Sequence, residues 1–140
     1  MRTAPVVSIA ALAMILLTGC AHNKASPMQD MSPVKDRSEF KLGKEELQTL
    51  KRLSSDNPFA AFRVYEYYEF FKFDQEQAMY YLHLSANQGY AKAQYSLGNY
   101  MTFLTGYIDF KGAKMWLHKA AQQGDQDAAK ELAELDARGK

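Results

Sequence analysis

Two stretches of the sequence, AMYYLHLSANQGYAKAQYSLG at residues 78–98 and AKMWLHKAAQQGDQDAAKELA at residues 113–133, share one pattern. A shift of 35 residues aligns them without a gap and places His83 on His118 and Gly89 on Gly124. Similarity that returns at one fixed period of about 20–50 residues is typical of a repeat protein. The sequence therefore predicts that this part of the chain contains two copies of one structural unit.

Signals for the starts and ends of helices divide residues 40–140 into a series of helices with short connections. Asn57, which a proline follows, and Asp74 are typical N-caps, and Asp109 stands where Asp74 stands in the other copy. Gly89 and Gly124 suit the left-handed position that ends a helix. Because the connections have few residues, neighbouring helices should run antiparallel. The prediction is an all-α domain without strands.

The repeated pattern, A-x-x-Y/W-L-H-x-x-A-x-Q-G-x-x-x-A with LG after the first copy, resembles Sel-1-like repeats, which are short-period relatives of tetratricopeptide repeats. The resemblance covers about residues 58–135. It implies a short right-handed solenoid of antiparallel helical hairpins, with about two and a half repeats. In this family, alanines pack the two helices of a hairpin, and the glycine turns the chain into the next hairpin. The charged last half-unit would then serve as a cap.

The first copy departs from this pattern in two places. A shift of 33 residues aligns AAFRVYEYYEF with AQYSLGNYMTF and places Tyr65 where the family pattern has the glycine seen at Gly98. Such a tyrosine should hold the first helix pair further apart or turn it. The connection that leads to Asp74 is also two residues shorter than the corresponding connection to Asp109. We therefore expect a different local geometry in the first unit.

The N-terminus has the pattern of an exported lipoprotein. Arg2 precedes an apolar run at residues 4–17, which is shorter than the roughly 20 residues that span a membrane and suits a signal peptide. The run ends in LTGC, which resembles the lipobox of bacterial lipoproteins. That resemblance implies that residues 1–19 are removed and that Cys20 carries a diacylglyceryl group and an acylated N-terminus. The alternative is an ordinary signal or anchor helix with an incidental cysteine.

Residues 20–39 are predicted to form the lipidated N-terminus and a flexible tether. They are polar, contain Pro27 and Pro33 and lack an apolar period, so a coil with its ends about 20–25 Å apart is expected. In enterobacterial-type lipoproteins an aspartate after the cysteine signals retention in the inner membrane, whereas Ala21 follows Cys20 here. The resemblance therefore implies the periplasmic leaflet of the outer membrane in a Gram-negative host. Residues 40–140 are predicted to form the Sel-1-like helical repeat domain.

Composition and motifs argue against an enzyme and against nucleic-acid binding. Without the signal peptide the chain has sixteen basic and sixteen acidic side chains, and a net charge near zero does not favour nucleic acid. Cys20 is the only cysteine in the sequence, so its acylation would leave no thiol for catalysis or metal binding. His83 and His118 occupy one repeat position and are interpreted as structural, and His22 lies in the tether. We predict no catalytic residue, no metal and no cofactor.

The stretch FRVYEYYEFFKF at residues 62–73 has seven aromatic residues among twelve, which is too many for one buried stripe. Those that do not face the core either form a surface for a partner or fill gaps and cover the end of a small domain. In the family, the first helix of each unit tends to line the concave face. The resemblance therefore implies a partner-binding set of Arg63, Glu66, Tyr67, Phe70, Gln94, Asn99, Tyr100 and Phe103.

The leading hypothesis is a lipid-anchored module for protein–protein interaction that acts as an adaptor or scaffold for an envelope assembly. A second hypothesis comes from a resemblance to small exported Sel-1-like immunity proteins. In that case the protein would occlude a secreted toxin, such as a lipase delivered into the periplasm. A hydrolase that uses His83 or His118 is the third and least supported hypothesis. The expected partners are another protein, either an envelope component or a toxin, and the membrane through the lipid on Cys20, but not nucleic acid.

Overall fold

The computed structural model of the protein describes residues 37–106 and 108–140, which belong to one compact unit. This part of the chain is helical and contains no strand, which confirms the all-α prediction. In chain order its elements are the 3-10 helix η1 (Arg37–Phe40), α1 (Lys44–Leu53), α2 (Pro58–Glu66), the π-helix η2 (Tyr67–Lys72), α3 (Gln75–Asn87), α4 (Ala91–Phe103), α5 (Phe110–Gln122) and α6 (Gln126–Ala137). The predicted signal peptide, Cys20 and most of the predicted tether lie outside the described residues.

The helices begin and end where the capping signals predict. The side-chain oxygens of Asn57, Asp74 and Asp109 each accept a hydrogen bond from the backbone N–H three residues later, at 3.0, 3.1 and 3.0 Å. These bonds satisfy backbone donors that the first helical turn leaves unpaired. Gly89 and Gly124 follow α3 and α5 with left-handed φ angles of 95° and 92°. The predicted N-caps and the predicted left-handed glycines are therefore confirmed.

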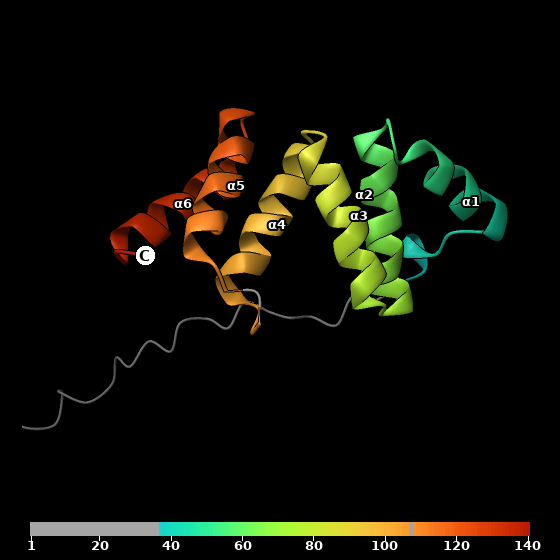
Figure 1. The fold of residues 1–140 in the computed structure, drawn as a ribbon, viewed down its shortest axis with the longest axis horizontal. Helices are drawn as coiled ribbons and strands as arrows, with labels where there is room; N and C mark the ends of the chain where they lie inside the picture. Colours follow the sequence, from blue (N-terminus) through green and yellow to red (C-terminus); the bar gives the residue numbers. More distant parts are fainter. Residues whose placement is uncertain (1–36, 107) are drawn as a thin grey trace, which may run out of the picture. The chain divides into compact units, whose positions relative to one another are not determined.

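Each α-helix packs against the next one in the chain. Figure 1 shows α2, α3, α4 and α5 side by side in chain order, with successive connections at opposite edges of this unit. The α3–α4 and α5–α6 connections lie at the upper edge of the view, and the connections that follow η2 and α4 lie at the lower edge. The C-terminal ends of the α2–η2 segment and of α4 therefore lie at the same edge.

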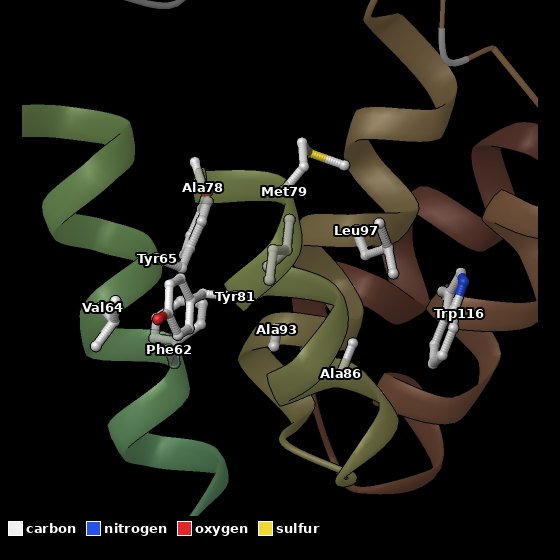
Figure 2. Close-up of a cluster of buried hydrophobic side chains, with 11 residues drawn as sticks. Phe62, Val64, Tyr65, Ala78, Met79, Tyr81, Ala86, Ala93, Leu97 and Trp116 are labelled. Carbon is white, nitrogen blue, oxygen red and sulfur yellow. The ribbon is translucent and has the colours of Figure 1, made fainter. Parts of the chain in front are cut away.

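The core follows the repeated positions of the sequence. Figure 2 shows one apolar cluster with side chains from α2, α3, α4 and α5, namely Phe62, Val64, Tyr65, Ala78, Met79, Tyr81, Leu82, Ala86, Ala93, Leu97 and Trp116. A smaller cluster joins α5 to α6 and consists of Ala113, Leu117, Ala120, Ala128 and Leu135. Five pairs of positions related by the 35-residue shift are buried in both copies: Ala78 with Ala113, Tyr81 with Trp116, Leu82 with Leu117, Ser85 with Ala120, and Ala93 with Ala128. The repetition in sequence thus corresponds to a repetition in burial.

The two units differ at the position that is Tyr65 in the first unit and Gly98 in the second. Gly98 lies directly against α5, because a Cβ added to it would stand 2.7 Å from Cγ of Leu117. The equivalent Tyr65 is buried, and its ring centroid lies 5.2 Å from that of Phe62. The second unit therefore has the tighter seam between its two helices.

The end of the first helix of the first unit is wound as a π-helix. η2 continues α2 without a break, and its C-cap Phe73 has left-handed backbone angles (φ 56°, ψ 36°). The N–H of Asp74 donates to the carbonyl oxygen of Tyr68 at 3.0 Å. In the second unit, α4 ends at Phe103 and the chain continues through the extended residue Leu104. The wider π-helical turn and the left-handed residue return the chain to α3 through the shorter connection.

Candidate partner-binding surface

Two of the eight predicted partner-binding residues lie in the interior of the described unit. Tyr67 and Gln94 have exposed fractions of 7% and 5%. Nε2 of Gln94 donates to the carbonyl oxygen of Ala86 at 3.2 Å, and Oε1 of Gln94 accepts from Nε2 of Gln123 at 2.8 Å. Gln94 therefore ties α4 to the ends of α3 and α5. The sequence pattern placed Gln94 on a first helix but could not show its burial, because the residues that cover it belong to other helices.

Arg63 and Glu66 form an ion pair within one turn of α2, and both side chains are partly buried. Nη2 of Arg63 also donates to the carbonyl oxygen of Glu39 at 3.4 Å. Glu39 belongs to η1, so the arginine connects the N-terminal 3-10 helix to α2. A partly exposed ion pair adds little stability by itself. We therefore assign Arg63 a positioning role for η1.

Phe70 lies between two aromatic rings. Its ring centroid is 4.7 Å from that of Phe40 and 6.1 Å from that of Tyr65. These separations are typical of favourable aromatic pairs. Because Phe40 belongs to η1, the N-terminal 3-10 helix covers this predicted site residue.

Tyr100 belongs to a hydrogen-bonded group that joins α4 to the first unit. Its hydroxyl donates to the carboxylate of Glu69 and forms a second hydrogen bond with the hydroxyl of Tyr65. Burial raises the pKa of Tyr65. Burial, together with the hydrogen bond to Glu69, raises the pKa of Tyr100. Both phenols therefore keep their protons at neutral pH and remain hydrogen-bond donors.

A pocket of about 220 Å³ lies at the end of α4 and is lined by Asn99, Tyr100, Phe103 and Leu104. It brings together three of the predicted residues, and Phe103 among them is 59% exposed. Pockets for small-molecule ligands usually have about 300–1,000 Å³. This pocket is smaller and suits a single side chain. Leu104 was not predicted, because it follows the last residue of the helix and lies outside its period.

Part of the aromatic run at residues 62–73 fastens α1 to the rest of the unit. Tyr68 stacks on Tyr81, with ring centroids 6.0 Å apart and an interplanar angle of 7°. Nζ of Lys51 in α1 lies 4.9 Å from the ring centre of Tyr68, and its hydrogen bond with Tyr68 raises the pKa of Lys51. This cation–π arrangement stabilises the contact of α1 with η2 and α3. Tyr68 therefore has a structural role, since it packs on α3 and holds α1 in place. Phe73 at the end of η2, in contrast, is 64% exposed.

A second pocket, of about 490 Å³, lies beside the two glycine connections and contains none of the predicted site residues. Gln88 and Gln123, which precede Gly89 and Gly124, are among its lining residues. Nε2 of Gln88 donates to the carbonyl oxygen of Ser54 at 2.7 Å. The Gln-Gly pair that occurs in both copies was the feature of the sequence that could have pointed to this pocket. Hydrogen bonds to neighbouring helices indicate that these glutamines are structural.

His83 and His118 occupy equivalent positions and differ in burial. His83 is half-buried and its pKa is lowered by that burial, whereas His118 is exposed. In the part of the chain that the structure describes, no group of three or more His, Cys, Asp or Glu residues could hold a metal ion. Within the same residues, no helix has both the length and the apolar character that crossing a membrane requires.

Comparison with known proteins gives one informative similarity. The chain is 33% identical over 101 residues to a protein of Escherichia coli strain K12 that carries the name Uncharacterized protein YibG. The alignment covers 69% of this chain and 66% of the E. coli protein, so the chain spans a little less than two thirds of that relative. No family model matches the sequence, and no solved structure matches it.

Proposed function

We propose that this protein is a lipid-anchored module for protein–protein interaction that acts as an adaptor or scaffold of an envelope assembly. The observation that carries the proposal is the pocket at the end of α4, where Phe103 is 59% exposed beside Tyr100. Exposed aromatic residues at a pocket are typical centres of protein–protein interfaces. The small volume of the pocket favours a partner's side chain over a metabolite.

The scaffold for this pocket, in our proposal, is a short right-handed solenoid of antiparallel Sel-1-like hairpins. The support is the set of equivalent positions that are buried in both copies, together with the left-handed Gly89 and Gly124. Helices α2 and α3 would form one hairpin, α4 and α5 the next, and α6 the capping half-unit. This arrangement would place the ends of both first helices on one binding edge.

The membrane anchor in this proposal is a lipid on Cys20. The support is the LTGC sequence after a short apolar run, and Ala21 favours the periplasmic leaflet of the outer membrane. Several acyl chains at one site anchor a protein stably, whereas one chain does not. The Cys20→Ser protein should lose incorporation of a labelled fatty acid and should leave the membrane fraction. Continued labelling of this variant would refute the lipid anchor.

The partner site can be tested by photo-crosslinking in living cells. The crosslinking amino acid p-benzoylphenylalanine would replace Asn99, which lines the pocket, and Phe103 would stay in place. We expect a crosslink to one protein, and we expect Phe103→Ala to remove it. The matched control carries the same crosslinker at Phe59, which is 54% exposed at the start of α2. Absence of any product that depends on Phe103 would refute the proposed function.

The identity of the crosslinked protein also separates the two candidate roles. An envelope component would support the adaptor, and a secreted toxin would support the immunity protein. The proposal gives no catalytic role to His83 or His118, so changing both to glutamine should leave the crosslink at its wild-type level. Loss of the crosslink in this double variant would reopen the hydrolase hypothesis.

A further inference from the structure

The first unit shows how an aromatic ring covers the end of a first helix. Phe70 in η2 packs against Phe40, with a centroid separation of 4.7 Å. Phe40 ends η1, a single turn of 3-10 helix, and the carbonyl oxygen of the preceding Glu39 accepts a hydrogen bond from Arg63. The covering segment therefore makes two contacts of different kinds, one through a phenylalanine ring and one through its backbone.

The second unit has the equivalent residue uncovered. Phe103 corresponds to Phe70 at the 33-residue shift, and it is 59% exposed on the rim of the 220 Å³ pocket. Tyr65 connects Phe70 of the first unit with the pocket of the second. Its ring lies 6.1 Å from that of Phe70, and its hydroxyl forms a hydrogen bond with Tyr100, which lines the pocket. The covered and the uncovered position are thus neighbouring parts of one aromatic row.

We propose that the pocket of α4 receives one phenylalanine side chain from a short exposed turn of a partner protein, as Phe70 receives Phe40 within the chain. The inference rests on the function proposed above and adds the chemistry of the partner. The observation that supports it is the contact of Phe40 with Phe70. This contact shows which kind of segment packs on the end of a first helix. Burial of a ring against Phe103 would remove apolar surface of both partners from water.

The polar neighbours of the pocket indicate how the backbone of the turn is recognised. The charged pair Arg63 and Glu66 of the first unit corresponds to Ser96 and Asn99 in the second. The amide of Asn99 can donate and accept hydrogen bonds, so it can pair with a peptide backbone. Since the residues that line the pocket are uncharged, binding should depend on the ring and on the backbone. We therefore expect only a weak dependence on ionic strength.

A second copy of this chain is a poorer occupant than another protein. Its own Phe40 already packs on Phe70, and its Arg63 already holds the neighbouring carbonyl. Release of these contacts would oppose binding in trans. The pocket is also smaller than those usual for drug-sized ligands, which disfavours a small molecule.

The probe for this inference is the covering segment itself, made as a fluorescent peptide with the sequence DRSEFKL of residues 36–42. Its binding to the full-length chain in lipid nanodiscs would be followed by fluorescence anisotropy, with empty nanodiscs as the blank. We expect saturable binding that weakens at least about fivefold in Phe103→Ala. Replacement of the peptide's phenylalanine by alanine should abolish binding, and about 0.5 M salt should change the affinity less than twofold.

The control variant is Phe59→Ala, which removes a phenylalanine of similar exposure from the start of α2 and should bind the peptide as the wild type does. Thermal melting of both variants would show that they remain folded. Absence of saturable binding at millimolar peptide, or binding that Phe103→Ala leaves unchanged, overturns the inference. Binding that survives the loss of the peptide's phenylalanine overturns it too.

Mass spectrometry of the crosslink from position 99 separates this inference from the proposed function. A crosslinked site within a few residues of a phenylalanine of another protein supports both. A crosslink that depends on Phe103 and lies on a segment without phenylalanine, or on a second copy of this chain, refutes the inference and leaves partner binding intact. Absence of the crosslink refutes the proposed function itself.

Discussion

Tyr65 and Gly98 occupy the same position in the first helices of the two units, and they join their helices to neighbours in opposite ways. Gly98 has no side chain, so α5 approaches until a Cβ at this position would lie 2.7 Å from Leu117. Tyr65 fills the corresponding space with a ring and reaches Tyr100 of the next unit with its hydroxyl. One repeat position can therefore serve packing within a unit or attachment between units, and the size of the residue decides which.

The ends of the two first helices differ in a related way. In the first unit, the π-helix η2 is covered by η1 through the contact of Phe40 with Phe70. In the second unit, the pocket around Phe103 has no such cover from the described residues. Two positions that align at the 33-residue shift are thus a structural contact in one case and a candidate binding site in the other.

The largest expected effect comes from Gly98→Tyr, which gives the second unit the residue of the first. The added side chain would meet Leu117 and the backbone of Ala113, so the free energy of unfolding should fall by about 3 kcal/mol. Urea denaturation followed by far-UV circular dichroism measures this change. Gly43→Tyr is the control and should cost no more than about 1 kcal/mol, because no atom lies within 4 Å of a Cβ there. A wild-type urea midpoint for Gly98→Tyr would contradict the tight seam.

The next effect concerns the glycine connections at the other edge. Gly89→Val should destabilise by more than about 1 kcal/mol, because its φ of 95° strains a β-branched residue even though space for a Cβ is open. Gly124→Val should cost less, since α6 alone follows it. Thermal melting compares both with Gly43→Val, whose φ of −66° is ordinary. Unchanged melting temperatures in both variants would show that the helix boundaries are wrong.

A smaller effect is expected when the link between the units loses its hydroxyl. Tyr65→Phe keeps the ring and removes the hydrogen bond to Tyr100, so the free energy of unfolding should fall by about 1 kcal/mol. Tyr80→Phe, on the exposed face of α3, is the matched control. Equal urea midpoints for the two variants would remove the inter-unit role of Tyr65.

The same link predicts a dependence on alkaline pH. The pKa values of Tyr65 and Tyr100 are raised above the ordinary value of 10.0, so the folded state favours the protonated phenols. Their contribution to stability is complete below pH 10.0 and is lost as the pH rises further, because the unfolded chain releases these protons first. The wild type should therefore lose stability more steeply above pH 10.0 than Tyr65→Phe. Parallel pH profiles would contradict this account.

The smallest expected effect is a gain in stability from Phe73→Gly. Glycine relieves the left-handed strain at this residue, while loss of the ring removes the cation–π contact with Arg37 at 4.8 Å. The net gain should be up to about 0.5 kcal/mol. The same change at Phe103, inside the last turn of α4, should instead cost about 1 kcal/mol. Equal signs for the two changes would mean that the two helix ends do not differ as described.

The candidate site was predictable in part. The repeat register placed Asn99, Tyr100 and Phe103 on one first helix, and these three line the same pocket. It also placed Tyr67 and Gln94 on first helices, where the fold buries both. A helical period separates an apolar face from a polar one, but it does not say whether a flanking position meets a neighbouring helix. Of the eight predicted residues, Phe103 alone is exposed.

The sequence by itself determined the local features of this protein: the period of 35 residues, the N-caps at Asp74 and Asp109, and the left-handed glycines. The caps and the glycines depend on residues within about one helical turn, so short-range sterics and hydrogen bonding decide them. The tertiary structure alone decided that Phe40 covers Phe70 while Phe103 stays exposed. The physical reason is distance along the chain. Contacts between elements thirty residues apart depend on how whole helices pack, and a repeating pattern leaves that open wherever the neighbours of its copies differ.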